Sequence, residues 1–198
     1  MDIVIKKYFD TWRAKNELPP EIRGAVRGEL FGDLGTLNKW RNWRTGLRYE
    51  DEKAGGVLSG ALDDCVVYPV FDSEVAQTRG ERSRRVEGKY YAALDYKTRG
   101  YPPKEGGHKF YQGQLDAYTL LLEENGYPTN HLAYLVYYFP KEVRENGLVN
   151  FNVEVKEVKT NSENAKKEFK RALEVLKSSM PLKHSECAFC SWGEGFLE

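Results

Sequence analysis

The sequence has no excess of charge of either sign, few cysteines and no long apolar run. Thirty Lys and Arg residues balance thirty Asp and Glu residues in 198. The composition therefore gives no general attraction for polyanions, and any nucleic-acid binding has to come from a local surface. No apolar run approaches the ~20 residues of a membrane-spanning helix, and Asp2 and Lys6 do not suit a signal peptide. We expect a cytoplasmic protein that does not bind a membrane.

Cysteine is scarce, with three residues in the chain, and two of them form the pair Cys187-x-x-Cys190. An odd number is atypical of a secreted disulfide framework. With His184 the pair has metal-like spacing. However, a structural zinc site takes four ligands and an iron–sulfur cluster usually takes four thiolates. Only three candidate ligands lie close together in the sequence, because Cys65 belongs to a predicted strand far from them. We therefore interpret His184, Cys187 and Cys190 as a remnant of a cluster or zinc site.

The residues that are present predict one folded domain over residues 1–198. Hydrophobic residues make up 40% of the chain and charged residues 30%, as in a globular protein with a sizeable core. We divide the domain into an N-terminal helical part (1–50), a core (51–160), and a C-terminal helix with the cysteine tail (161–198).

Hydrophobic periodicity predicts both helices and strands. The predicted strands cover residues 57–68, 89–98, 132–139 and 148–158. The predicted helices are an N-terminal one that ends before Pro19, a short one over 36–44 with Trp40 and Trp43 on one side, one over 110–124 with Phe110 on its apolar stripe, and one from a capping box at Thr160 to about residue 180. From residue 57 on, the order β–β–α–β–β–α predicts an α/β fold with a central mixed β-sheet flanked by α-helices. Residues 72–85 are polar and charged and are expected to form a mobile loop.

Two charged residues interrupt the apolar strand predicted over residues 89–98. Because side chains alternate along a strand, Asp95 and Lys97 share one face. Burying either charge alone is costly, so a partner or a metal is expected nearby. Asp63, in the preceding predicted strand, could converge with Asp95 if the two strands pair antiparallel. Two carboxylates with phosphate oxygens commonly hold Mg²⁺, and Lys97 could then orient or deprotonate the attacking water, or offset charge on the phosphorane. The alternative is a salt-bridged strand pair without catalysis.

The helix predicted over residues 110–124 carries Gln114 and Tyr118 four positions apart, on one face. An amide and a phenol on the core side of a helix need polar partners. An active site that binds phosphate or water would supply them. The alternative is that Tyr118 lies at the edge of the core with its hydroxyl in solvent.

Three short motifs occur in a fixed order: Gly60-Ala-Leu-Asp63, Asp95-Tyr-Lys97, and Gln114-x-x-x-Tyr118. This arrangement resembles the PD-(D/E)XK nuclease superfamily, in particular its RecB-like branch, which includes CRISPR-associated exonucleases. The resemblance implies a restriction-endonuclease-like core. It also implies that Asp63, Asp95 and the carbonyl of Tyr96 bind Mg²⁺ or Mn²⁺, that Lys97 is catalytic, and that Gln114 and Tyr118 shape the site and contact DNA.

Members of this branch that hold an iron–sulfur cluster have one cysteine upstream of the first acidic motif and three downstream of it. This chain has only Cys187 and Cys190 in its tail. We therefore expect no cluster in these residues, although a longer native chain could form one. The predicted function is a metal-dependent nuclease acting on single- or double-stranded DNA, of exonuclease type, in repair, recombination or defence. The alternative is a catalytically silent nucleic-acid-binding or scaffold module with the same fold.

Overall fold

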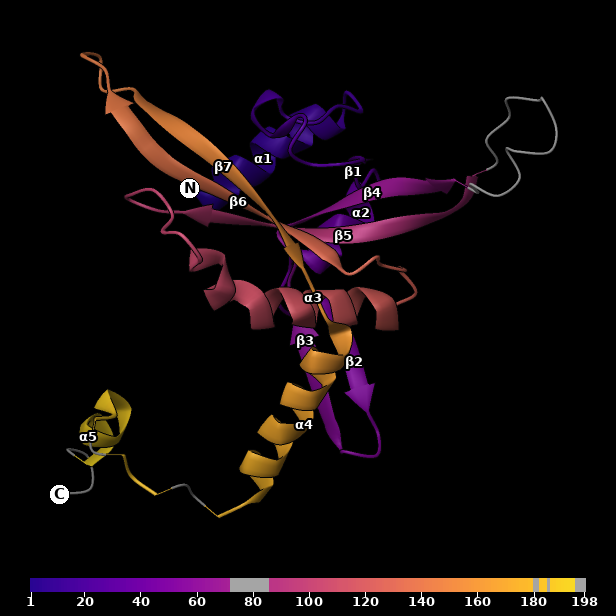
Figure 1. Cartoon of the computed structure of the whole chain (residues 1–198), viewed down its shortest axis with the longest axis vertical. Helices are drawn as coiled ribbons and strands as arrows, with labels where there is room; N and C mark the ends of the chain where they lie inside the picture. The colour runs from indigo at the N-terminus through magenta and orange to yellow at the C-terminus, as the bar shows by residue number, and fades with distance from the viewer. Residues whose placement is uncertain (72–85, 180–181, 185, 195–198) are drawn as a thin grey trace.

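The computed structural model describes residues 1–71, 86–179, 182–184 and 186–194. Its centre is a five-stranded sheet in the order β1-β4-β5-β6-β7 (Figure 1). The strands are β1 (Glu29–Leu30), β4 (Asp64–Phe71), β5 (Val86–Thr98), β6 (Leu132–Val143) and β7 (Val149–Lys159). β5 and β6 are parallel and the other neighbours are antiparallel. The predicted α/β class, with a mixed sheet flanked by helices, is confirmed.

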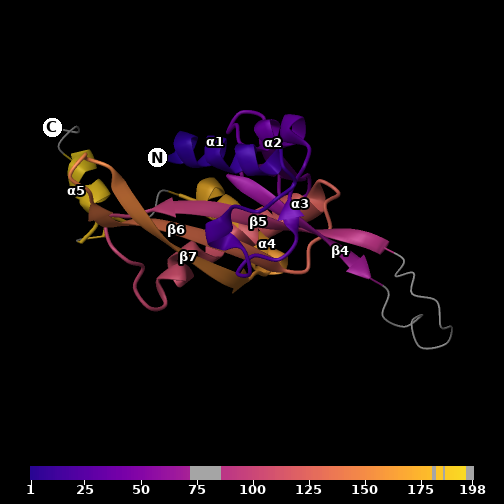
Figure 2. The ribbon, with the colours of Figure 1, turned by 90° about the horizontal axis from the view of Figure 1, so that it is seen from above.

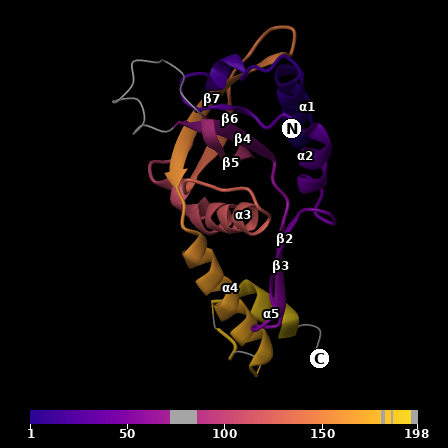
Figure 3. The ribbon, with the colours of Figure 1, turned by 90° about the vertical axis from the view of Figure 1, so that its right-hand side faces the viewer.

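One face of the sheet is covered by α1 (Asp2–Arg13). The α1 residues Ile5 and Phe9 are buried and pack against Ala92 and Leu94 of β5. α2 (Leu34–Trp40) lies beside α1, as Figures 2 and 3 show from two directions. The spacing of Ile5 and Phe9 produces this packing, because residues four apart lie on one side of a helix.

The opposite face is covered by α3 (Gln112–Glu124), which follows a short 3-10 helix over Gly107–Tyr111. Leu115 and Leu122 of α3 pack against Ala93 of β5 and Leu135 of β6. Parallel neighbours such as β5 and β6 need a crossover connection, and α3 forms it. The side chains of β5 therefore alternate between an α1 side and an α3 side.

A hairpin of β2 (Leu47–Asp51) and β3 (Gly56–Gly60) extends below α3, next to α4 (Ser162–Lys177). A short helix, α5 (Ala188–Glu194), follows near the C-terminus. Gly60 ends β3 against α3, and a Cβ built there would lie 2.7 Å from Leu121 Cδ1. Glycine at this position allows the close approach of β3 to α3.

The single strand predicted over residues 57–68 is wrong. The chain leaves the hairpin at Gly60 and enters the sheet only at Asp64. Between them, the Leu62 amide donates to the Trp40 carbonyl at 3.0 Å instead of pairing with a strand. Pro69 does not end β4, because β1 pairs only with Val66 and Val67 and leaves that edge open at Pro69, where a missing N–H costs nothing.

Other local expectations also need correction. Trp43 lies beyond the end of α2 and is 75% exposed, although Trp40 is buried. Phe110 precedes α3 and is 91% exposed. The N-cap of α4 is Asn161, whose side chain accepts from the Asn164 amide at 3.1 Å, whereas Thr160 bonds to a residue of α3. The loop expected over residues 72–85 lies outside the described residues.

Candidate active site

Asp95 and Lys97 lie on β5, on the face that α3 covers. Their side chains form an ion pair, with 2.5 Å between Lys97 Nζ and Asp95 Oδ2. Asp95 is 2% exposed, so its charge has little access to solvent. The Lys97 ammonium also lies 4.4 Å from the ring centre of Tyr111. The alternation of the strand therefore places a carboxylate and an ammonium together in a mostly apolar layer.

Gln114 of α3 joins this pair to Tyr118. Its side-chain oxygen accepts from Lys97 Nζ at 3.0 Å, and its nitrogen donates to Asp95 Oδ1 at 3.3 Å and to the Tyr118 hydroxyl at 2.7 Å. The structure thus brings four of the predicted site residues into one hydrogen-bonded group. We call Asp95, Lys97, Gln114 and Tyr118 the Asp95 cluster.

Asp63 lies in the break before β4 and is half-buried. It therefore lies outside the strands, although the sequence predicted it within a strand over residues 57–68. Its Oδ2 accepts from the Tyr96 amide at 3.1 Å, which holds Asp63 against the backbone next to Asp95. The charge of Asp63 helps to raise the pKa of both Asp95 and Tyr118, so the electrostatics also place it beside the Asp95 cluster.

Burial dominates the electrostatics of the cluster. It raises the pKa of Asp95 to about 6, against the opposing effect of the hydrogen bond and charge of Lys97. Burial, together with the nearby charge of Asp95, raises the pKa of Tyr118 to about 12. Tyr118 is therefore a neutral phenol at physiological pH, and Asp95 is a carboxylate that a proton or a cation can readily neutralise.

The residues present fit a divalent cation with hard oxygen ligands. Asp95 Oδ2 is buried, and among the described residues its one polar contact is the ion pair with Lys97. Asp63 supplies a second carboxylate next to it. In the part of the chain that the structure describes, no group of three or more His, Cys, Asp or Glu side chains could hold a metal. A cation bound here would thus take two carboxylates and complete its shell with water or phosphate oxygens, as Mg²⁺ commonly does.

The cysteine tail is separate from the Asp95 cluster in sequence. Cys187 and Cys190 are partly exposed, and hydrogen bonds with Cys190 lower the pKa of Cys187. His184 Nδ1 accepts from the Glu186 amide at 3.2 Å. Among the described residues these three form no metal-binding group. Cys65 is fully buried on the α3 side of β4, where burial raises the pKa of its thiol.

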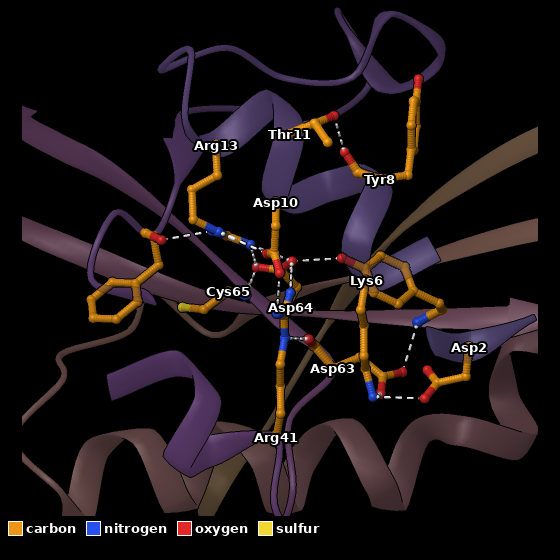
Figure 4. Close-up of polar contacts among 12 residues, drawn as sticks. Asp2, Lys6, Tyr8, Asp10, Thr11, Arg13, Arg41, Asp63, Asp64 and Cys65 are labelled. Carbon is orange, nitrogen blue, oxygen red and sulfur yellow. Dashed lines mark hydrogen bonds and ion pairs between the residues drawn. The ribbon is translucent and has the colours of Figure 1, made fainter. Parts of the chain in front are cut away.

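A second charged group, on the α1 side of the sheet, was not predicted (Figure 4). Asp64 is fully buried, and its carboxylate accepts from Arg13 at 2.6 and 2.8 Å and from Arg41 at 3.0 Å. The Tyr96 hydroxyl donates to it at 2.6 Å. We call Asp64, Arg13, Arg41 and Tyr96 the Asp64 cluster. Its one sequence signal is that Arg13 continues the spacing of Ile5 and Phe9 along the apolar face of α1.

The three sequence motifs lead us to expect DNA cleavage, and on that expectation Gln114→Leu should lower its rate by about 10- to 100-fold while changing DNA affinity little. The substitution keeps the size of the side chain but removes the acceptor for Lys97 and the donor for Asp95, so both groups lose their orientation. Single-turnover rates and binding curves measured in Ca²⁺ would separate the two effects. Gln112→Leu, two positions earlier on the same helix, also removes hydrogen bonds, to Asp116 and to the Lys159 carbonyl, but outside the Asp95 cluster, and is the matched control for that loss. An equal loss of stability and activity would instead make Gln114 a core residue.

The chain was compared with known proteins. The family model of the PD-(D/E)XK nuclease superfamily matches residues 82–194, more than half of the chain. This range contains the whole Asp95 cluster, whereas Asp63 precedes it. Neither the curated proteins nor the solved structures give a significant match. Among the described helices, none is long and apolar enough to cross a membrane.

Proposed function

The chain belongs to the PD-(D/E)XK nuclease superfamily, and we propose that it is a metal-dependent deoxyribonuclease that hydrolyses phosphodiester bonds with Mg²⁺ or Mn²⁺. The observation that supports this most is the Asp95 cluster, in which a buried carboxylate and an ammonium are oriented by one glutamine. Membership of the superfamily indicates a nuclease-type activity. The choice of DNA, the metal and the roles of single residues belong to the proposal.

In the proposed mechanism Asp63, Asp95 and the carbonyl of Tyr96 would hold the cation. A bound divalent cation polarises a phosphoryl oxygen and lowers the pKa of a coordinated water. Lys97 is held by Asp95 and Gln114 at the edge of this site. From there its ammonium can orient the attacking water and offset negative charge that develops on the phosphorane. Gln114 positions Lys97, and Tyr118 remains a neutral hydrogen-bonding group.

We assign the chain to the RecB-like branch and to exonuclease action, in DNA repair, recombination or defence. The support is the order of the three motifs and the packing of Gly60 against Leu121 and Tyr118 of α3, which brings the start of the G-x-x-D motif next to Tyr118. Asp63 of this motif reaches β5 through the Tyr96 amide. Cleavage of DNA labelled separately at its 5′ and 3′ ends would test both the action and its polarity.

The second candidate is a nucleic-acid-binding or scaffold module without activity. It is favoured by the two ion pairs that neutralise the acidic residues within the protein, Lys6 with Asp63 and Lys97 with Asp95. The experiment that decides is incubation of the whole chain with single- and double-stranded DNA in Mg²⁺, Mn²⁺ or EDTA. Products that form only with the metals support the nuclease. Binding without products would support the silent module.

We predict that the affinity for Mn²⁺ will fall about tenfold per pH unit below pH 6 and will change little above pH 7. The pKa of Asp95 is about 6, against a reference value of 3.8, and the protonated acid is a poor ligand. The contribution of Asp95 to the stability of the metal-free protein depends on pH in the opposite direction. Because the folded pKa is the higher, Asp95 by itself adds stability to the metal-free protein as the pH falls from 6 towards 4, a contribution given by the difference from Asp95→Asn. Mn²⁺ titrations and melting curves in EDTA at each pH would measure both trends.

A further inference from the structure

The first residues of α1 reach the proposed metal site. Lys6 Nζ lies 2.9 Å from Asp63 Oδ1 and 3.0 Å from Asp2 Oδ2 (Figure 4). The Lys6 and Asp63 side chains are 19% and 22% exposed, so their ion pair is mostly sheltered from solvent. Asp2 is 58% exposed and lies one helical turn before Lys6.

The two oxygens of Asp63 differ in what holds them. Oδ2 accepts from the Tyr96 amide, a donor fixed in the backbone of β5. Oδ1 is paired only by a side-chain ammonium among the interactions described here, and that ammonium can move on its flexible stem. Oδ1 is therefore the oxygen that is more easily released, and a cation that takes the place of the Lys6 ammonium there leaves the bond to the Tyr96 amide intact.

We propose that Lys6 is an internal competitor of the divalent cation, seated on Asp63 until a metal displaces it. This inference rests on the proposed function, because it takes Asp63 as a metal ligand. The displaced ammonium keeps a partner in Asp2, so its departure does not leave a charge unpaired. A phosphate of the substrate, which is an anion, offers a second new partner. Lys6 thereby weakens metal binding in the absence of substrate and couples it to the arrival of phosphate.

The test is the dissociation constant for Mn²⁺ of the whole metal-free chain, measured from the electron paramagnetic resonance signal of free Mn²⁺ at pH 8. Lys6→Met should bind Mn²⁺ about fivefold more tightly, the size expected when a partly exposed competing ion pair is removed. Lys6→Arg keeps the charge and should bind as the parent does. Lys7→Met, at the next and exposed position of α1, makes the same charge change away from Asp63 and should have little effect.

The coupling is tested by repeating the titration with a non-hydrolysable phosphorothioate oligonucleotide. The oligonucleotide should tighten Mn²⁺ binding more in the parent than in Lys6→Met. Unchanged or weaker Mn²⁺ binding by Lys6→Met would overturn the proposal, as would an equal effect of Lys7→Met. If neither the parent nor Lys6→Met binds Mn²⁺, the proposed function fails together with this inference. If both bind equally, only the role of Lys6 fails. Lys6→Gln replaces Lys6→Met if circular dichroism shows that the latter does not fold.

Discussion

Lys97→Ala is expected to lower the rate of DNA cleavage by about 10³-fold, within the range for removal of a general acid–base group or a stabilising charge. The Lys97 ammonium lies next to Asp95 and donates a hydrogen bond to Gln114, which orients it. Lys97 is the cation of the Asp95 cluster, and no other member of the cluster can replace its charge. The measurement is the single-turnover rate on end-labelled DNA in saturating Mg²⁺ at pH 8, where Asp95 is ionised.

Loss of Lys97 also removes the charge that opposes protonation of Asp95. The Mn²⁺ affinity of the variant must therefore be measured beside its rate, and a nearly unchanged affinity assigns the loss to the chemical step. Lys109→Ala, an exposed lysine just before α3, is the matched control and should cleave at the parental rate. If Lys97→Ala retains more than about a tenth of the activity, Lys97 is not catalytic, because loss of a general acid–base group usually lowers the rate by about 10²- to 10⁴-fold.

Asp64→Ala is expected to destabilise the fold by about 3–5 kcal/mol, the usual cost of removing one partner from a buried ion pair. The Arg13 and Arg41 side chains are only 4% and 9% exposed, so both guanidinium groups would lose their buried counter-charge. The Tyr96 hydroxyl would lose its acceptor as well. Urea unfolding followed by circular dichroism gives the change in the free energy of unfolding.

Asp10→Asn is the control for Asp64→Ala. Asp10 contacts the same two arginines, but its side chain is 26% exposed, and its loss should cost about 1 kcal/mol or less. Replacing Arg13 and Arg41 by methionine together with Asp64→Leu should recover much of the stability, since apolar residues of similar size often replace buried ion pairs without loss. A loss below about 1 kcal/mol for Asp64→Ala would contradict the prediction, because a buried pair broken on one side costs several times more.

The strands that carry the site could be predicted because their patterns are local. β5 alternates around Asp95 and Lys97, and the spacing of Gln114 and Tyr118 places both on one side of a helix. The break at Asp63 could not be predicted, because Val57 to Tyr68 reads as a continuous run. What interrupts it is a tertiary hydrogen bond from Leu62 to the backbone of α2.

The charged contacts that involve residues outside the three motifs could not be predicted from the sequence, for a different reason. The Asp64 cluster joins residues that are 23 and 51 positions apart in the chain. Lys6 meets Asp63 across a similar separation. Neither arginine stands in a recognisable spacing with Asp64, and only the folded sheet brings them together. Sequence patterns predict which residue types lie on one face of an element, but they do not assign partners between distant elements.

β5 is the central strand of the five, paired with β4 on one side and with β6 on the other. Its pairing with β4 ends at Leu94, so around Asp95 the backbone of β5 is paired with β6, and the Tyr96 amide is bonded to the Asp63 carboxylate instead. The amides bonded to β6 should be among the slowest in the protein to exchange hydrogen with solvent. The same property bears on the proposed catalysis, because Asp95 and Lys97 lie on backbone that does not need to reorganise as charge develops in the reaction. The entropic cost of fixing Asp95 and Lys97 is met when the chain folds, before any substrate arrives.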